Sequence, residues 1–236
     1  MLAKIKNNFI RQWKYVLILM VLISLSQAVL GQFNSEIGYT ASYMPAKSVN
    51  MIIDRYNANQ EMIEEMKNFK YVSGFNAGLS YKAGMMRFGA FWESQTAKKM
   101  GTEGNLIGND PGTEKKLYFY FNSVSGGLAL VRDNIGIGTT VDYNFFRLKT
   151  NKSGVSNRVD VIKEDYMSSK AYLIFYLRVN NKLGIELKPY ARFPWTKADL
   201  YPLGDYLLLE RQEDFHFSDF LQYGISFNIL NGKQGD

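Results

Sequence analysis

The chain has 236 residues, no cysteine and a single histidine, and its formal charge is +6 at pH 7. The lack of cysteine excludes disulfide bonds and thiolate metal sites. Much of the positive charge lies in the first 31 residues, which carry basic side chains and no acid. The rest of the chain is therefore close to neutral, which argues against the basic surface that nucleic-acid binding requires.

The first 31 residues have the layout of a secretory signal peptide. A basic segment precedes an apolar run from Tyr15 to Leu25, and Val29 and Gly31 offer small or modest side chains at a cleavage site before Gln32. The apolar run is shorter than the roughly 20 residues of a membrane-spanning helix. Cleavage after Gly31 is therefore favoured over an uncleaved anchor or a buried helix. Because no later segment resembles a transmembrane helix, the mature chain is either soluble outside the cytoplasm or crosses a membrane as strands.

Eight later segments alternate apolar and polar side chains with a period of two, which is typical of β-strands. In chain order they cover about residues 36–43, 73–82, 86–95, 116–130, 135–145, 170–179, 183–193 and 221–230. The last segment is the clearest, with a wholly apolar face opposite a small or polar one. Ten residues of this pattern are about the length of a strand that crosses a bilayer at a tilt of roughly 45°.

Two of the predicted strands fit the pattern poorly. In residues 116–130, Tyr118 and Tyr120 share a face with Val124, but Phe119 and Phe121 lie on the opposite face. Either a bulge or a projection of the strand above a membrane would explain this. Residues 172–177 are apolar on both faces.

The connections between these strands alternate in length. Short turns are predicted at residues 83–84, 132–134 and 180–182, and long loops at residues 45–70, 96–115, 149–168 and 194–214. The first long loop could hold an amphipathic helix between Met51 and Met66. Short turns on one side and long loops on the other are typical of bacterial outer-membrane barrels. A Greek-key sandwich would not separate them so regularly, and a lipocalin-like barrel would be apolar inside.

The predicted fold is an all-β, eight-stranded, antiparallel, up-and-down transmembrane β-barrel over residues 32–230, with a short tail at residues 231–236. Together with the signal peptide, this pattern resembles the small OmpA/OmpX-like outer-membrane barrels. The resemblance implies contact with membrane lipid and lipopolysaccharide, and insertion by the outer-membrane assembly machinery. The assembly signal would be read inside the last strand, at Tyr223, Ile225 and Phe227, because the chain continues to Asp236. No peptidoglycan-binding domain is expected after the barrel, and neither is a nucleic-acid partner.

Charged side chains recur on the face opposite the apolar one, where they would point into the barrel. These residues are Glu36, Lys82, Arg87, Glu93, Asp142, Glu186, Lys188 and Arg192. They are four acids and four bases, and an eight-stranded barrel is just wide enough to be filled by side chains. Burying such groups costs several kcal/mol each unless they are paired. We therefore expect a paired ionic network in preference to an ion path.

His216 is the only histidine, so catalysis by an imidazole would have to use it. Asp214 and His216 resemble the pair of omptin proteases, and His216 and Ser218 resemble the pair of lipid A deacylases. Omptins, however, need ten strands and a second acid pair, and the deacylase needs an acid about a dozen residues further on. No phosphate loop or metal cluster is present in the sequence. The chain is therefore predicted not to be an enzyme and to need no cofactor.

The last long loop is unusually apolar. Its candidate contact residues are Trp195, Leu200, Tyr201, Leu203, Tyr206, Leu207, Leu208 and Leu209. Such a patch can contact a partner protein, or the loop can fold over the barrel mouth or extend the strands. The predicted function is a structural, accessory or surface-binding role through the four outer loops. The alternatives are a narrow channel or a subunit of a larger transport or secretion machine, and an outer-leaflet lipid-modifying enzyme that uses His216.

Overall fold

The computed structural model describes residues 32–104, 112–152, 158–180, 182–207, 217–218 and 220–232. The predicted signal peptide, His216, Leu208 and Leu209 lie outside these ranges.

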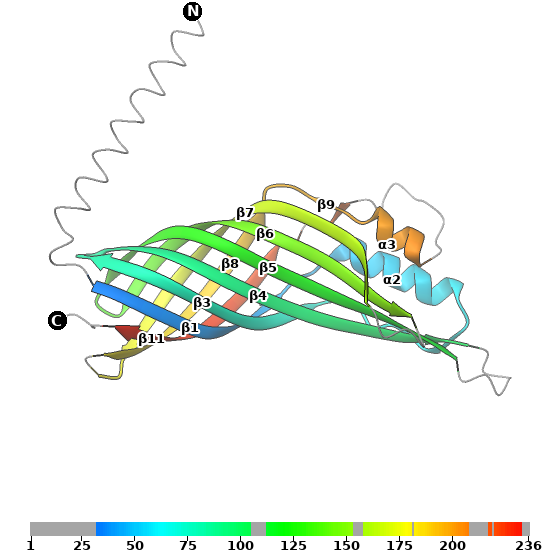
Figure 1. Cartoon of the computed structure of the whole chain (residues 1–236), viewed down its shortest axis with the longest axis horizontal. Coiled ribbons are helices and arrows are strands. Elements are labelled where there is room, and N and C mark those ends of the chain that lie inside the picture. Colours follow the sequence, from blue (N-terminus) through cyan, green and yellow to red (C-terminus); the bar gives the residue numbers. More distant parts are fainter. Residues whose placement is uncertain are drawn as a thin grey trace, which may run out of the picture.

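Eight long strands form one antiparallel sheet that closes into a ring (Figure 1). They are β1 (Gln32–Tyr43), β3 (Tyr71–Ala83), β4 (Met86–Glu103), β5 (Thr113–Arg132), β6 (Ile135–Lys152), β7 (Val159–Arg178), β8 (Leu183–Pro194) and β11 (Gln222–Gly232). Each strand pairs with the next one in this series, and β1 pairs with β11 from Asn34 opposite Gly232 to Tyr43 opposite Tyr223. The predicted eight-stranded, up-and-down antiparallel barrel is confirmed, and its closure leaves no free edge around this part of the sheet.

Tight turns join the strands at one end of the barrel. The paired residues Ala83 and Met86 enclose a two-residue loop in which Gly84 has φ 59°. Asp133, with φ 53°, occupies the same position in the two-residue loop between β5 and β6. Glycine and aspartate tolerate this left-handed conformation, which two-residue hairpins favour.

Four neighbouring strands are longer than the sequence analysis predicts. In β4, β5, β6 and β7, residues 96–103, 113–115, 149–152 and 159–168 are strand, whereas the sequence pattern predicts polar loops there. These strands continue past the ends of β1, β3, β8 and β11, so one side of the rim is tall and the other is low (Figure 1). We call the upper parts of these four strands, residues 97–103, 113–122, 145–152 and 159–167, the wall.

The segments that start from the low rim fold against the inner face of the wall (Figure 1). They are α2 (Lys47–Asn59), β9 (Ala198–Asp199), α3 (Tyr201–Tyr206) and β10 (Phe217–Ser218). The short strand β2 (Met62–Glu64), which follows α2, lies beside β4 as part of the same sheet. The helix predicted between Met51 and Met66 therefore starts and ends earlier, because residues 62–64 pair with the top of β4 instead. Neither helix in the described part of the chain is long and apolar enough to span a membrane.

The barrel is apolar outside and polar inside. On β11, the predicted assembly-signal residues Tyr223, Ile225 and Phe227 point outward and are exposed, whereas Gln222 and Asn228 are buried. Most water-soluble barrels have the opposite arrangement, because their interior is their hydrophobic core.

Candidate functional site

The barrel interior contains two clusters of ion pairs. In the lower cluster, nearer the tight turns, Arg87 Nη2 lies 2.7 Å from Glu36 Oε2, and Lys188 Nζ lies 2.8 Å from the same oxygen. Glu186 pairs with both cations, with its Oε2 atom 2.9 Å from Lys188 Nζ. All four side chains are buried, so each charge is compensated by two opposite charges across the narrow interior.

The upper cluster is centred on Arg192. Its Nη2 atom lies 2.9 Å from Glu93 Oε1, its Nε atom lies 3.0 Å from Asp142 Oδ2, and Nη1 donates to Gln222 at 2.9 Å. Lys170 Nζ, 3.2 Å from Glu93 Oε2, completes the cluster. Lys170 is not among the predicted interior residues. Residues 172–177, which follow it, are apolar on both faces, so their pattern does not show which face of the strand points into the barrel.

Seven of the eight predicted interior residues thus lie in these two clusters. The eighth, Lys82, lines an open cavity of about 290 Å³ at the tight-turn end of the barrel instead, together with Arg178 and Asn34.

A neutral hydrogen-bonded group accompanies the ion pairs. The Tyr190 hydroxyl lies 3.1 Å from Thr40 Oγ1 and 3.0 Å from Ser42 Oγ, and it accepts a hydrogen bond from Gln95 Nε2 at 3.0 Å. The ring approaches Gly224 so closely that a Cβ atom there would lie 2.5 Å from Tyr190 Cζ. Gly224 therefore makes room for this tyrosine inside the barrel.

A cavity of about 40 Å³ is lined by residues of both clusters, among them Glu36, Glu93 and Lys170. Asn76 and Asn228 also line it, and their Oδ1 atoms are buried without a hydrogen-bond partner. A polar space of this size can hold a few water molecules. Among the described residues, the interior is thus an ion-paired filling with a small polar cavity between its two clusters.

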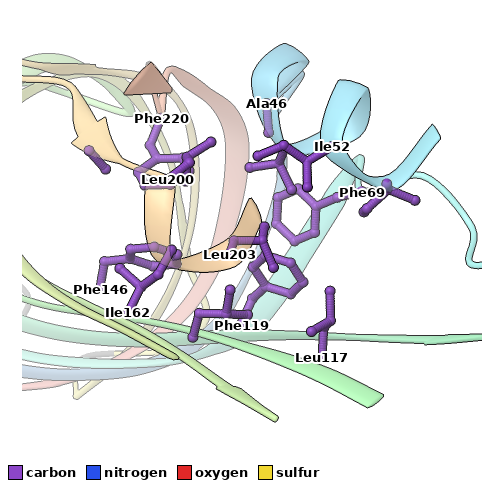
Figure 2. Packing of buried hydrophobic residues seen from close by; sticks show 14 of the residues in the cluster. Ala46, Ile52, Phe69, Leu117, Phe119, Phe146, Ile162, Leu200, Leu203 and Phe220 are labelled. Carbon is purple, nitrogen blue, oxygen red and sulfur yellow. The ribbon is translucent and has the colours of Figure 1, made fainter. Parts of the chain in front are cut away.

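Above the ion pairs, the barrel mouth is closed by a hydrophobic cluster, which we call the mouth cluster (Figure 2). Its buried members are Met44, Ala46, Val49, Ile52, Ile53, Tyr56, Met66, Phe69, Val72, Leu117, Phe119, Phe121, Phe146, Leu148, Ile162, Tyr166, Ala198, Leu200, Leu203, Leu207 and Phe220. Aromatic rings form its centre: Phe121 and Phe146 are stacked at 4.8 Å between centroids, and Phe146 and Phe220 lie 4.6 Å apart. Aromatic contacts of this kind add to the stabilisation from buried area.

The mouth cluster explains the irregular strand at residues 116–130. Phe119 and Phe121 face inward and are buried in the cluster, opposite Tyr118 and Tyr120 on the outer face. The register between β5 and β6 runs without interruption from Lys115 to Arg132. This register excludes a bulge, and β5 instead extends beyond the ends of β1 and β3 with Phe119 and Phe121 on its inner face.

Two asparagines of α2 attach the helix to the segment that returns toward β3. Asn57 Nδ2 donates to the Met66 carbonyl at 2.9 Å, and the Met66 N–H donates to Asn57 Oδ1 at 3.0 Å. Asn50 makes the same pair of bonds with Phe69, at 2.8 and 2.6 Å. The side-chain amides therefore satisfy backbone groups that no neighbouring strand could reach.

A polar group at the far end of the wall, which we call the tip cluster, joins α2 and α3 to the wall. The Tyr56 hydroxyl donates to Glu103 Oε1 at 2.7 Å, and Lys115 Nζ lies 2.7 Å from the same oxygen. Lys115 Nζ also lies 5.1 Å from the ring centroid of Tyr56 and 6.0 Å from that of Tyr206. Burial, with help from the hydrogen bond to Glu103, raises the pKa of the Tyr56 phenol.

The apolar residues predicted as a partner contact divide into two groups. Leu200, Leu203 and Leu207 are buried in the mouth cluster, as expected if the loop folds over the barrel mouth. Trp195 and Tyr201 are exposed, at 57% and 37% of their surface. Tyr206 is half-buried against the cluster. Of the described members, only Trp195 and Tyr201 are well placed to contact a partner.

Within the described ranges, no group of three or more His, Cys, Asp or Glu side chains is placed to hold a metal ion. His216, on which the enzyme alternative depends, lies outside the described ranges.

No protein-family model and no curated protein matches the chain. Among solved structures, Ail, the attachment invasion locus protein of Yersinia pestis, in complex with the heparin analogue sucrose octasulfate, is 11% identical with a TM-score of 0.47, over 86% of this chain and 99% of Ail. Neisserial surface protein A is 8% identical with a TM-score of 0.35, over 85% of this chain and 96% of that protein. The protease OmpT of Escherichia coli is 7% identical with a TM-score of 0.38, again over 85% and 96%. Identities and TM-scores this low say nothing about function, and the eight-stranded barrel fold is shown by the closed strand pairing of the chain itself.

Proposed function

We propose that this chain is an outer-membrane barrel that acts by binding at the cell surface and does not catalyse a reaction. The observation that carries the proposal is a change of polarity along β5 and β6. Below this change the outward side chains are mostly apolar, up to Val124 on β5 and Phe145 on β6, and the inward ones are small or polar except for Val131 near the tight turn. Above it, Phe121 and Phe146 are buried inside, and the outer face carries Arg147. The wall therefore has its own core and a polar outer face, as a module outside a bilayer requires.

The outward apolar belt has the dimensions of a membrane. On β6 it runs from Ile135 to Phe145, and ten residues of a strand tilted by about 45° rise roughly 23 Å. The belt of an outer-membrane barrel is about 25 Å tall. With the tight turns in the periplasm, the wall and the mouth cluster project from the cell.

Export and insertion belong to the same proposal. The signal peptide of residues 1–31 would be cleaved after Gly31, leaving residues 32–230 as the barrel. Tyr223, Ile225 and Phe227 on β11 would be recognised by the assembly machinery. The belt would contact membrane lipid, and the surface above it would contact lipopolysaccharide.

Binding is favoured over transport because side chains obstruct the path through the barrel in two separate regions. Ion pairs cross the interior at two levels, and the mouth cluster lies above them. The second candidate, a narrow channel or a subunit of a transport or secretion machine, is favoured only by the cavity of about 290 Å³ at the periplasmic end. An enzyme that uses His216 is the least supported candidate.

Planar-bilayer recording of the purified mature protein tests the proposal. We expect no conductance steps from the wild type. A variant without residues 45–70, which lacks α2 and β2, tests whether the ion pairs alone block the barrel and is expected to conduct weakly at most. Steady conductance by the wild type would overturn binding in favour of transport. A phenotype of His216→Ala with intact folding would instead favour the enzyme.

A further inference from the structure

The outer face of the wall carries more positive than negative groups. Three of its cations have an acid beside them. Arg147 Nη1 lies 2.7 Å from Asp165 Oδ1, Lys149 Nζ lies 3.3 Å from Asp160 Oδ1, and Lys116 pairs with Glu114. Within the described part of the chain, no carboxylate lies within salt-bridge distance of Lys98, Arg158 or Lys163. We call the first two of these cations, Lys98 and Arg158, together with Tyr118 and Tyr120, the cationic patch.

These two cations converge on one aromatic ring. Arg158 Cζ lies 4.1 Å from the ring centroid of Tyr118, and Lys98 Nζ lies 5.8 Å from the same centroid. Arg158 Nη1 also donates a hydrogen bond to the Tyr120 hydroxyl. The ring and this hydrogen bond hold the guanidinium in place, so its remaining N–H groups are presented outward.

Such an arrangement suits a ligand with a negative charge. Two cations over one ring repel each other, and no carboxylate of the described residues lies within 4.0 Å of either of them. An anion that bridges them would gain charge-assisted hydrogen bonds from both, and a guanidinium fixed by stacking matches the oxygens of a phosphate. We propose that the cationic patch binds a phosphate group on the sugar headgroup of an outer-leaflet glycolipid.

The height of the patch points to a lipid-borne phosphate. Tyr118 is paired with Lys149 of β6, four residues beyond Phe145, the last outward apolar residue on that strand. At a tilt of about 45°, four residues raise the chain by roughly 9 Å. The patch therefore lies just above the hydrocarbon, on the face that continues the lipid-facing surface. The molecules beside this face are the sugar–phosphate headgroups of neighbouring lipids.

The experiment measures lipid binding by the full mature protein in dodecyl maltoside micelles, using native mass spectrometry. The probe is rough lipopolysaccharide, compared with the same lipid after removal of its phosphates by hydrofluoric acid. The double variant Lys98→Gln/Arg158→Gln is expected to bind the phosphorylated lipid at least about tenfold more weakly than the wild type. Both proteins are expected to bind the dephosphorylated lipid equally weakly.

The matched control is Lys47→Gln/Arg55→Gln, which removes one lysine and one arginine from α2 and leaves the outer face of the wall unchanged. It is expected to bind like the wild type. Equal loss in both double variants would show that only total charge matters and would overturn the site. Unchanged binding by Lys98→Gln/Arg158→Gln would overturn it as well. Soluble inositol hexakisphosphate is expected to compete poorly, and full competition would overturn the lipid as the source of the phosphate.

This inference rests on the proposed position of the wall outside the cell. Trypsin digestion of intact cells tests that position separately, because lysines of the wall would be cleaved only if it faces outward. If trypsin cleaves the wall and the protein does not bind the phosphorylated lipid, the cationic patch is not a phosphate site, but the proposed function is unaffected. If the wall is inaccessible, the proposed function fails first.

Discussion

The barrel interior and the mouth are both buried, yet they are built from opposite chemistry. The interior is held by charges such as Arg87, Glu93 and Arg192, whereas the mouth cluster is held by aromatic rings such as Phe121 and Phe146. Both regions use the inner face of the same strands. On β6 the change occurs between Asn144, which is polar, and Phe146.

The contrast between a charged interior and an aromatic mouth follows from what surrounds the outside of the barrel at each level. In the proposed membrane placement, the outside of the belt meets hydrocarbon, so polar side chains are confined to the interior and must be paired there. Above the belt, the outside meets water, so the wall forms an ordinary hydrophobic core on its inner face. The barrel interior should therefore be destabilised most when a charged side chain loses its partner. The mouth cluster should be destabilised most when an aromatic ring is removed.

The largest effect is expected from Arg192→Met. The change leaves Asp142 and Glu93 without their shared cation, and breaking a buried ion pair costs about 3–5 kcal/mol. Urea unfolding of the protein in lipid vesicles should show this loss in the transition of the whole barrel. Lys82→Met is the control, because Lys82 lies half-exposed beside the open cavity at the tight-turn end and should cost less than about 0.5 kcal/mol. Equal losses in the two variants would contradict the ion-pair account.

Phe146→Ala should destabilise the mouth by about 3 kcal/mol, because it removes a ring that stacks on Phe121 and contacts Phe220. The transition of the barrel should stay nearly unchanged, while limited proteolysis within α2 becomes faster. Phe145→Ala, one residue earlier and on the outer face, controls for loss of a ring and should leave α2 protected. If Phe146→Ala lowered the stability of the whole barrel as Arg192→Met does, the two regions would not be energetically separate.

Asn57→Ala tests how α2 is attached at the edge of the mouth. It leaves the N–H and carbonyl of Met66 without their partner, and an unsatisfied buried group costs about 1–3 kcal/mol. Hydrogen exchange at Met66 should accelerate accordingly. The exposed Asn59, on the same helix, provides the matched change Asn59→Ala, for which no acceleration at Met66 is expected.

The sequence predicts the belt well and the wall poorly, for the same physical reason. Within the belt, the apolar outer face and the polar interior alternate along each strand, which reveals all eight strands and seven of the charged interior residues. On the wall the apolar face changes sides, so Phe119 and Phe121 look like errors in the pattern and the strand ends are placed too early. Lys170 is missed because its strand is apolar on both faces. The burial of Leu203 and Leu207 depends on contacts with distant residues of α2 and the wall, which no local pattern contains.

The smallest effect is expected from Tyr56→Phe, which removes the hydrogen bond to Glu103 in the tip cluster and should cost about 1 kcal/mol at neutral pH. A more specific effect is expected on how the stability of the closed mouth depends on pH. The pKa of Tyr56 is raised in the folded protein, so its neutral form stabilises the closed mouth fully below the ordinary tyrosine pKa of about 10. As the pH rises above that value, the opened state loses the proton and the folded state keeps it, so stability falls. Protease protection of α2 should therefore decline less steeply above pH 10 in Tyr56→Phe than in the wild type, while Tyr71→Phe on the outward face should keep the wild-type slope. Parallel slopes in all three proteins would show that the mouth does not depend on the protonation of Tyr56.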